Sequence, residues 1–93
     1  MRIIAQGGTK DIPYEGVMVY VAYHMPTKIY ASPIINTNDE LPLGTYKNEE
    51  DALYVMDCIR YSKMKGCDYF FMPSAGSVPV WRQENRKVAS YDS

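Results

Sequence analysis

Among the side chains that could act as a nucleophile or a base near neutral pH, we consider first the two cysteines, Cys58 and Cys67, and the one histidine, His24. They are too few for a multi-histidine or thiolate metal site. A cysteine–histidine pair remains open, because its members meet in space and not in sequence. Neither cysteine lies in an activating motif, so we predict no catalytic residue, no metal ligand and no cofactor. A small cysteine-based enzyme is one hypothesis for the function, and we rank it below the two binding hypotheses given at the end of this section.

Five carboxylates fall within thirteen residues: Asp39, Glu40, Glu49, Glu50 and Asp51. One interpretation is a solvated loop followed by a helix start, where acidic residues complement the helix dipole. The sharper interpretation is an acidic patch that engages a basic partner surface. Such a patch could mimic nucleic-acid phosphate or hold a divalent cation, although the spacing is not that of a calcium loop. We take Asp39, Glu40, Glu49 and Glu50 as candidate partner-binding residues.

Length and composition indicate one ordinary folded domain. The chain has 93 residues, 46% hydrophobic and 23% charged, and its net charge of −1 gives no global field for nucleic acid or anionic lipid. We predict a domain over residues 1–73 and a C-terminal tail over residues 74–93, with a short helix from about residue 79 to 89 as the alternative to disorder.

Hydropathy predicts no membrane partner. The longest apolar run, residues 17–23, is far shorter than the ~20 residues that cross a bilayer. The opening residues also lack the apolar region of a signal peptide. We therefore expect the protein in the cytoplasm of a bacterial cell.

The elements that must position these side chains follow from alternation and turn signals. They predict strands at residues 2–6, 17–24, 28–35, 43–47 and 68–72, a proline-containing edge segment at 10–14 and a polar loop at 36–42. Gly7 and Gly8 predict a tight turn after the first strand. The expected fold is α+β, a small antiparallel or mixed β-sheet of about four to five strands with one α-helix packed on one face.

The single predicted helix covers residues 48–65. Asn48 is a good N-cap, the acidic residues after it fill the first turn, and Gly66 provides a stop. Its apolar positions recur at helical spacing. They predict a core face made of Ala52, Val55, Met56 and Ile59.

The hairpin of residues 17–24 and 28–35 has two faces. Val17, Val19, Val21 and Tyr23 alternate with Met18, Tyr20, Ala22 and His24. Placing the valines and Ile29 on one core face requires paired positions that sum to an even number, such as His24 with Lys28. His24 is then a surface histidine beside the turn.

The same parity places Met18, Tyr20 and Tyr30 together on the outer face. Aromatic side chains and methionine are enriched at protein interfaces, so these three are candidate partner-binding residues. The sequence has nine tyrosines in all. We predict that Tyr23, Tyr46 and Tyr69 belong to the core.

Two sets of residues in the sequence carry a resemblance to a known family. The first is Met1, Arg2, Ile3 and Ile4 followed by Gln6, Gly8, Asp11, Pro13, Tyr14 and Glu15, and the second is Tyr46, Glu49, Glu50, Ala52, Met56 and Ile59. They resemble a family of small proteins from Firmicutes bacteria and their phages; the double glycine and the segment after Pro73 depart from its pattern. The resemblance implies a mobile-element context, in which short non-enzymatic proteins often inhibit host systems by binding them.

The primary hypothesis is therefore a non-enzymatic protein-binding module of phage or mobile-element type that inhibits a host defence protein, as an anti-CRISPR protein does. Its partner is a host protein or a second copy of the chain, and nucleic acid is not expected. The alternative is an oligomeric protein that sequesters a small molecule or nucleotide, since so short a monomer has little room for an enclosed pocket.

Overall fold

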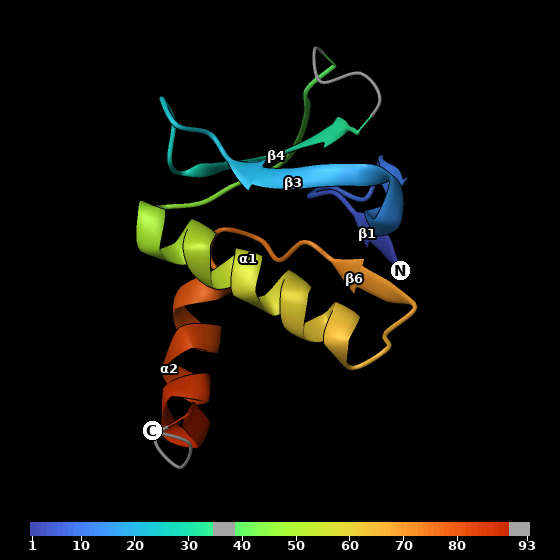
Figure 1. Ribbon diagram of the computed structural model, residues 1–93. Helices are drawn as coiled ribbons and strands as arrows, with labels where there is room; N and C mark the ends of the chain where they lie inside the picture. Colours follow the sequence, from blue (N-terminus) through green and yellow to red (C-terminus); the bar gives the residue numbers. More distant parts are fainter. Residues whose placement is uncertain (35–38, 90–93) are drawn as a thin grey trace.

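The computed structural model describes residues 1–34 and 39–89, with side chains as far as Gln83. The chain forms the α+β fold that the sequence predicts (Figure 1). In order, the elements are β1 (Arg2–Ile4), β2 (Asp11–Pro13), the short 3-10 helix η1 (Tyr14–Gly16), β3 (Val17–Val21), β4 (Lys28–Pro33), β5 (Leu41–Thr45), α1 (Glu49–Met64), β6 (Tyr69–Phe71) and α2 (Val78–Ala89).

The strands form two three-stranded sheets rather than one. The first has the order β2-β1-β6, with β1 antiparallel to β2 and parallel to β6. The second has the order β3-β4-β5 and is antiparallel throughout. Gly7 and Gly8 have φ of 85° and 73°, as the predicted tight turn requires. Pro13 lies in β2 at the edge of its sheet, where its missing N–H breaks no ladder.

Gln6 joins the two sheets. Its amide Nε2 donates to the carbonyl oxygens of Thr45 (3.2 Å) and Pro73 (2.9 Å), and its Oε1 accepts from the Thr45 N–H (2.9 Å). Its backbone N–H donates to the Leu43 carbonyl at 2.8 Å. One side chain therefore ties β5 to the segment that follows β6.

Tyr46 completes this junction. Its hydroxyl donates to the Pro73 carbonyl at 2.9 Å, and burial raises the pKa of that hydroxyl. A Cβ added at Gly44 would lie 2.9 Å from the Tyr46 hydroxyl and 3.0 Å from Gln6 Cδ, so a larger residue would force them apart. Gln6 and Tyr46, which help to carry the family resemblance, thus have an architectural role.

Helix α1 agrees with its prediction. The Asn48 Oδ1 caps it by accepting from the Asp51 N–H at 2.8 Å. The helix stops before Gly66, whose φ is 79°. Its buried apolar side chains are Ala52, Val55, Met56 and Ile59, the four predicted. They pack with Ile3, Ile29, Leu43 and Phe70 into one core between α1 and the sheets.

The hairpin register has the predicted parity. Tyr20 pairs with Tyr30 and Val19 with Ala31, so paired positions sum to an even number. The example of His24 with Lys28 is wrong, because β3 ends at Val21 and the turn begins earlier.

The placement of Tyr23 in the core is also wrong. Its side chain is 101% exposed, whereas Ala22, expected on the outer face, is 3% exposed. Both lie beyond the end of β3. Alternation holds only within a strand, so it no longer decides which way a side chain in the turn points.

Helix α2 matches the helical alternative for the tail in its described part. Val78 is fully buried, the Tyr54 hydroxyl of α1 donates to the Trp81 carbonyl at 3.5 Å, and α2 packs on α1 (Figure 1). Residues 90–93 of the tail lie outside the described residues.

Candidate functional site

The outer face of the hairpin brings together the three residues predicted there. The Tyr20 and Tyr30 rings stack with centroids 6.1 Å apart and planes at 25°. Met18 is 49% exposed, whereas both tyrosines are only partly exposed. Burial raises the pKa of the Tyr20 hydroxyl, and the nearby Glu40 carboxylate raises this pKa further. Glu40 therefore joins Met18 and the two tyrosines in one patch, which we call the hairpin face.

The predicted acidic residues separate into two groups. Asp39 and Glu40 precede β5, while Glu49 and Glu50 begin α1, and Figure 1 places these segments at opposite ends of the hairpin. Glu50 is ion-paired with Arg82 at 3.1 Å. Within residues 1–34 and 39–89, no group of three or more potential ligands is arranged to hold a metal ion.

Asp39 and Glu40 also border an open apolar hollow of about 360 Å³. Its walls include Ile12, Val17 and Leu41. A hollow with apolar walls and a carboxylate rim suits a lysine or arginine side chain, whose stem is apolar and whose head is charged. This feature fits the predicted contact with a basic partner surface.

Sequence reasoning missed the most exposed aromatic pair with ring stacking, Tyr69 and Phe71 of β6. Tyr69 is 59% exposed and Phe71 67% exposed, and their rings lie 6.4 Å apart. The prediction that Tyr69 is core is wrong. In a strand only one parity faces inward, and the residue that does so is Phe70, 7% exposed and paired with buried Ile3.

β6 is also an edge strand. Its inner side bonds to β1, where the Arg2 N–H donates to Asp68 and the Met72 N–H donates to Ile4. The alternation of backbone groups directs the N–H and C=O of Tyr69 and Phe71 to the other side, where no strand of the described chain pairs with them. We call this edge with its two rings the β6 face. The sequence contained one signal for this face. Side chains alternate along a strand, so with Phe70 in the core, Tyr69 and Phe71 of the last strand must point away from it.

The two cysteines and the histidine occupy different settings. Cys58 is half-buried, and burial raises the pKa of its thiol, which reduces the thiolate fraction at neutral pH. Cys67 is exposed in the turn before β6. His24 is exposed in the hairpin turn, as predicted.

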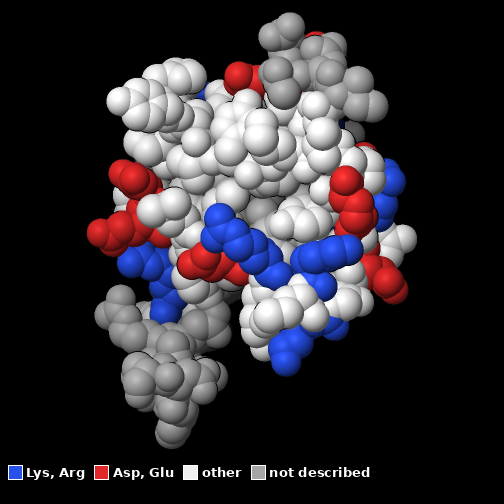
Figure 2. Space-filling view, in the orientation of Figure 1, with Lys and Arg blue, Asp and Glu red and all other residues white. Residues whose placement is uncertain are grey.

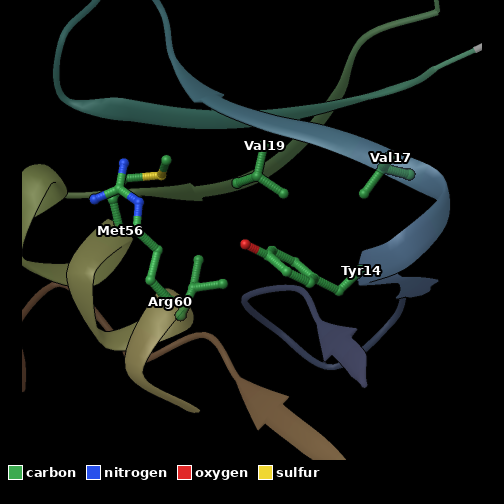
Figure 3. A pocket seen from close by; sticks show the side chains of 6 residues that line it. Tyr14, Val17, Val19, Met56 and Arg60 are labelled. Carbon is green, nitrogen blue, oxygen red and sulfur yellow. The ribbon is translucent and has the colours of Figure 1, made fainter. Parts of the chain in front are cut away.

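A pocket of about 220 Å³ opens between β3 and α1 (Figure 3). Its lining consists of Tyr14, Val17, Val19, Met56, Ile59 and Arg60. Figure 3 shows the Tyr14 hydroxyl pointing into the opening below Val19, toward the side of α1 that carries Met56 and Arg60. The valine face of β3 is thus only partly covered by α1, and the guanidinium of Arg60 and the phenol of Tyr14 border the opening.

Glu15 links η1 to α1 next to this pocket. Its carboxylate accepts from Lys63 Nζ at 2.6 Å and from the α-amino group of Met1 at 3.0 Å. These two contacts, Lys63 first, lower the pKa of Glu15 from 4.5 to about 2.

The low pKa of Glu15 predicts a pH-dependent contribution to stability. A carboxylate with a depressed folded-state pKa stabilises the fold above its unfolded pKa of 4.5, and the contribution is lost as the pH falls toward about 2. We expect Glu15→Gln to flatten the pH dependence of the urea midpoint across this window. Asp57→Asn, which removes an exposed carboxylate of α1, is the control and should keep the parent slope. An unchanged slope in Glu15→Gln would contradict the assignment.

Comparison with known proteins identified no relative of this chain. A scan against protein-family models, a search of curated proteins and a search of solved structures all found no match to the chain. The resemblance of its opening to the Firmicutes and phage family therefore stays an expectation. Among the described residues, no helix combines the length and apolar character needed to cross a membrane.

Proposed function

We propose that this protein is a binding module that recognises another protein without catalysing a reaction. One observation carries the proposal: two large aromatic rings, 59% and 67% exposed, lie side by side on an edge strand. Large exposed aromatic side chains are typical of surfaces that a partner covers, and here the backbone N–H and C=O groups of the same residues face outward without a paired strand.

The β6 face offers two kinds of contact. The outward N–H and C=O groups of Tyr69 and Phe71 can extend the β2-β1-β6 sheet by one partner strand. The rings can bury their apolar area against the same partner, and aromatic residues at interfaces often contribute ~2 kcal/mol or more each. Backbone pairing supplies affinity, while the rings supply selectivity for apolar partner side chains.

The hairpin face is the second contact surface. Met18 and the stacked Tyr20 and Tyr30 supply apolar area, and Glu40 supplies charge for a basic group of the partner. Asp39 lies with Glu40 at the rim of the neighbouring hollow. Glu49 and Glu50 stay in the proposal as a separate acidic surface at the start of α1. The family resemblance supports the narrower proposal that the target is a host defence protein, such as a CRISPR effector.

The proposal is tested by affinity capture from a host lysate at physiological salt, followed by titration of any captured protein. We expect the parent chain to recover a stoichiometric partner and the Tyr69→Ser, Phe71→Ser double variant to bind it at least about tenfold more weakly. Both substituted side chains are more than half exposed, so the thermal midpoint should change little.

Two further variants separate the surfaces. Tyr20→Ser with Tyr30→Ser tests the hairpin face, and loss of binding there with parent-like binding of the first variant would move the contact to the hairpin. Tyr61→Ser, which removes an exposed ring from α1, is the matched control and should bind as the parent does. Recovery of no partner from the lysate, or equal binding by all variants, would contradict the proposal.

A further inference from the structure

Two cross-strand pairs lie next to each other on the outer face of the hairpin. Met18 of β3 is opposite Ser32 of β4, and Tyr20 is opposite Tyr30 in the next row of the same face. The two tyrosine rings stack with their planes at 25°, and each side chain keeps part of its surface open to solvent. Partly exposed rings in this arrangement offer a π surface that attracts a cation.

The same face carries a carboxylate beside the rings. Leu41 of β5 pairs with Ala31, so the residue before it, Glu40, comes opposite Ser32 on the side of the sheet that carries the tyrosines. The contacts agree with this placement. Besides burial, hydrogen bonds of the Tyr20 hydroxyl with Ser32 and Glu40 act on its pKa. The carboxylate of Glu40 therefore adjoins the aromatic pair.

Glu40 is exposed and keeps its negative charge uncompensated. None of the ion pairs among the described side chains involves it, and the tyrosine hydroxyl that contacts it is neutral. Lys28 lies on the same face, but it is four residues from Ser32, or ~14 Å along β4. Figure 2 shows other lysine and arginine side chains gathered over α1, below the largely uncharged surface of the hairpin. The hairpin face thus complements a cation that comes from outside the chain.

We propose that the hairpin face binds an arginine side chain of the partner protein, with the guanidinium plane against the tyrosine rings and its N–H groups on the Glu40 carboxylate. A guanidinium is flat and stacks on aromatic rings, and its N–H fork fits the two oxygens of a carboxylate, which a lysine ammonium does not match. Met18, 49% exposed, supplies apolar surface for the stem of the arginine. The inference rests on the proposed protein-binding function and gives the chemistry of the partner at this face.

The test is a titration of the whole chain with N-acetyl-arginine methylamide, followed by NMR of the methionine methyl and tyrosine ring signals. We expect saturable shifts at Met18, Tyr20 and Tyr30 with a Kd of about 10 mM, as one charge-assisted contact and one cation–π contact give. The citrulline derivative has the same size and a planar head without charge, so it should bind at least about fivefold more weakly. The lysine derivative should bind about threefold more weakly, because it lacks the planar fork.

Three variants assign the contacts. Glu40→Gln removes the charge of an exposed side chain and should weaken binding of the arginine derivative about fivefold without a change in the thermal midpoint. Tyr30→Leu keeps an apolar side chain but removes one π surface, and should weaken binding about threefold. Asp57→Asn removes an exposed carboxylate of α1 and should bind as the parent does. Shifts that map away from the hairpin face, equal binding of the arginine derivative and either other derivative, or parent affinity in Glu40→Gln would each overturn the assignment.

The titration and the lysate capture fail separately. If a captured partner depends on the β6 face and the arginine derivative does not bind, the arginine site is overturned and the protein-binding function stands. If the arginine derivative binds in a manner that depends on Glu40 and the lysate yields no partner, the arginine site stands and the protein-binding function is contradicted.

Discussion

We expect the Ile59→Ala variant to unfold with a free energy about 2–4 kcal/mol below that of the parent chain. Ile59 is 1% exposed and lies in the core between α1 and the sheets. Truncation removes buried methylene and methyl groups and leaves a cavity that the surrounding side chains fill only in part. Urea unfolding followed by far-ultraviolet circular dichroism measures the difference.

Leu53→Ala is the matched control for this prediction. Leu53 lies on the same helix but is 48% exposed, so its truncation should lower the free energy of unfolding by less than about 1 kcal/mol. A loss below about 0.5 kcal/mol for Ile59→Ala would show that α1 packs through a different face.

We expect Arg82→Gln to release α2 from α1. Arg82 Nη1 lies 2.6 Å from Oδ1 of Asp51, a carboxylate that is 1% exposed. The other oxygen, Oδ2, has no hydrogen-bond partner within the described residues. Removal of the guanidinium leaves a buried charge without its counterion, and the helix must move to let water reach it.

Trp81, the one tryptophan of the chain, reports on this release. We expect its emission to shift to longer wavelength as the helix leaves α1. The helical signal should fall as well, because an undocked helix of 12 residues is only marginally stable in water. Fluorescence and circular dichroism below the unfolding transition measure both effects.

Two variants control the Arg82 experiment. Arg60→Gln breaks an exposed pair with Asp57 and should change stability by less than about 0.5 kcal/mol. Asp51→Asn added to Arg82→Gln removes the buried charge and should recover part of the lost stability. Parent-like emission in Arg82→Gln would show that other contacts suffice to hold α2.

Local physics explains what the sequence determined by itself. The cap of Asn48, the acidic first turn and the apolar spacing of α1 act within a few residues, so they predict the helix and its buried face. The parity that brings Tyr20 beside Tyr30 follows from the alternation of side chains along paired strands, and it needs only the knowledge that the valines face the core.

Tertiary structure decided which strands pair and what covers them. Tyr69 and Phe71 became an exposed, stacked aromatic pair because β6 is an edge strand of a separate sheet, and Asp51 became buried because α2 brings Arg82 onto α1. The pocket at Arg60 exists because α1 covers the valine face of β3 only in part. Each outcome depends on contacts between residues distant in the chain, whose formation is set by packing of the whole core rather than by any local pattern.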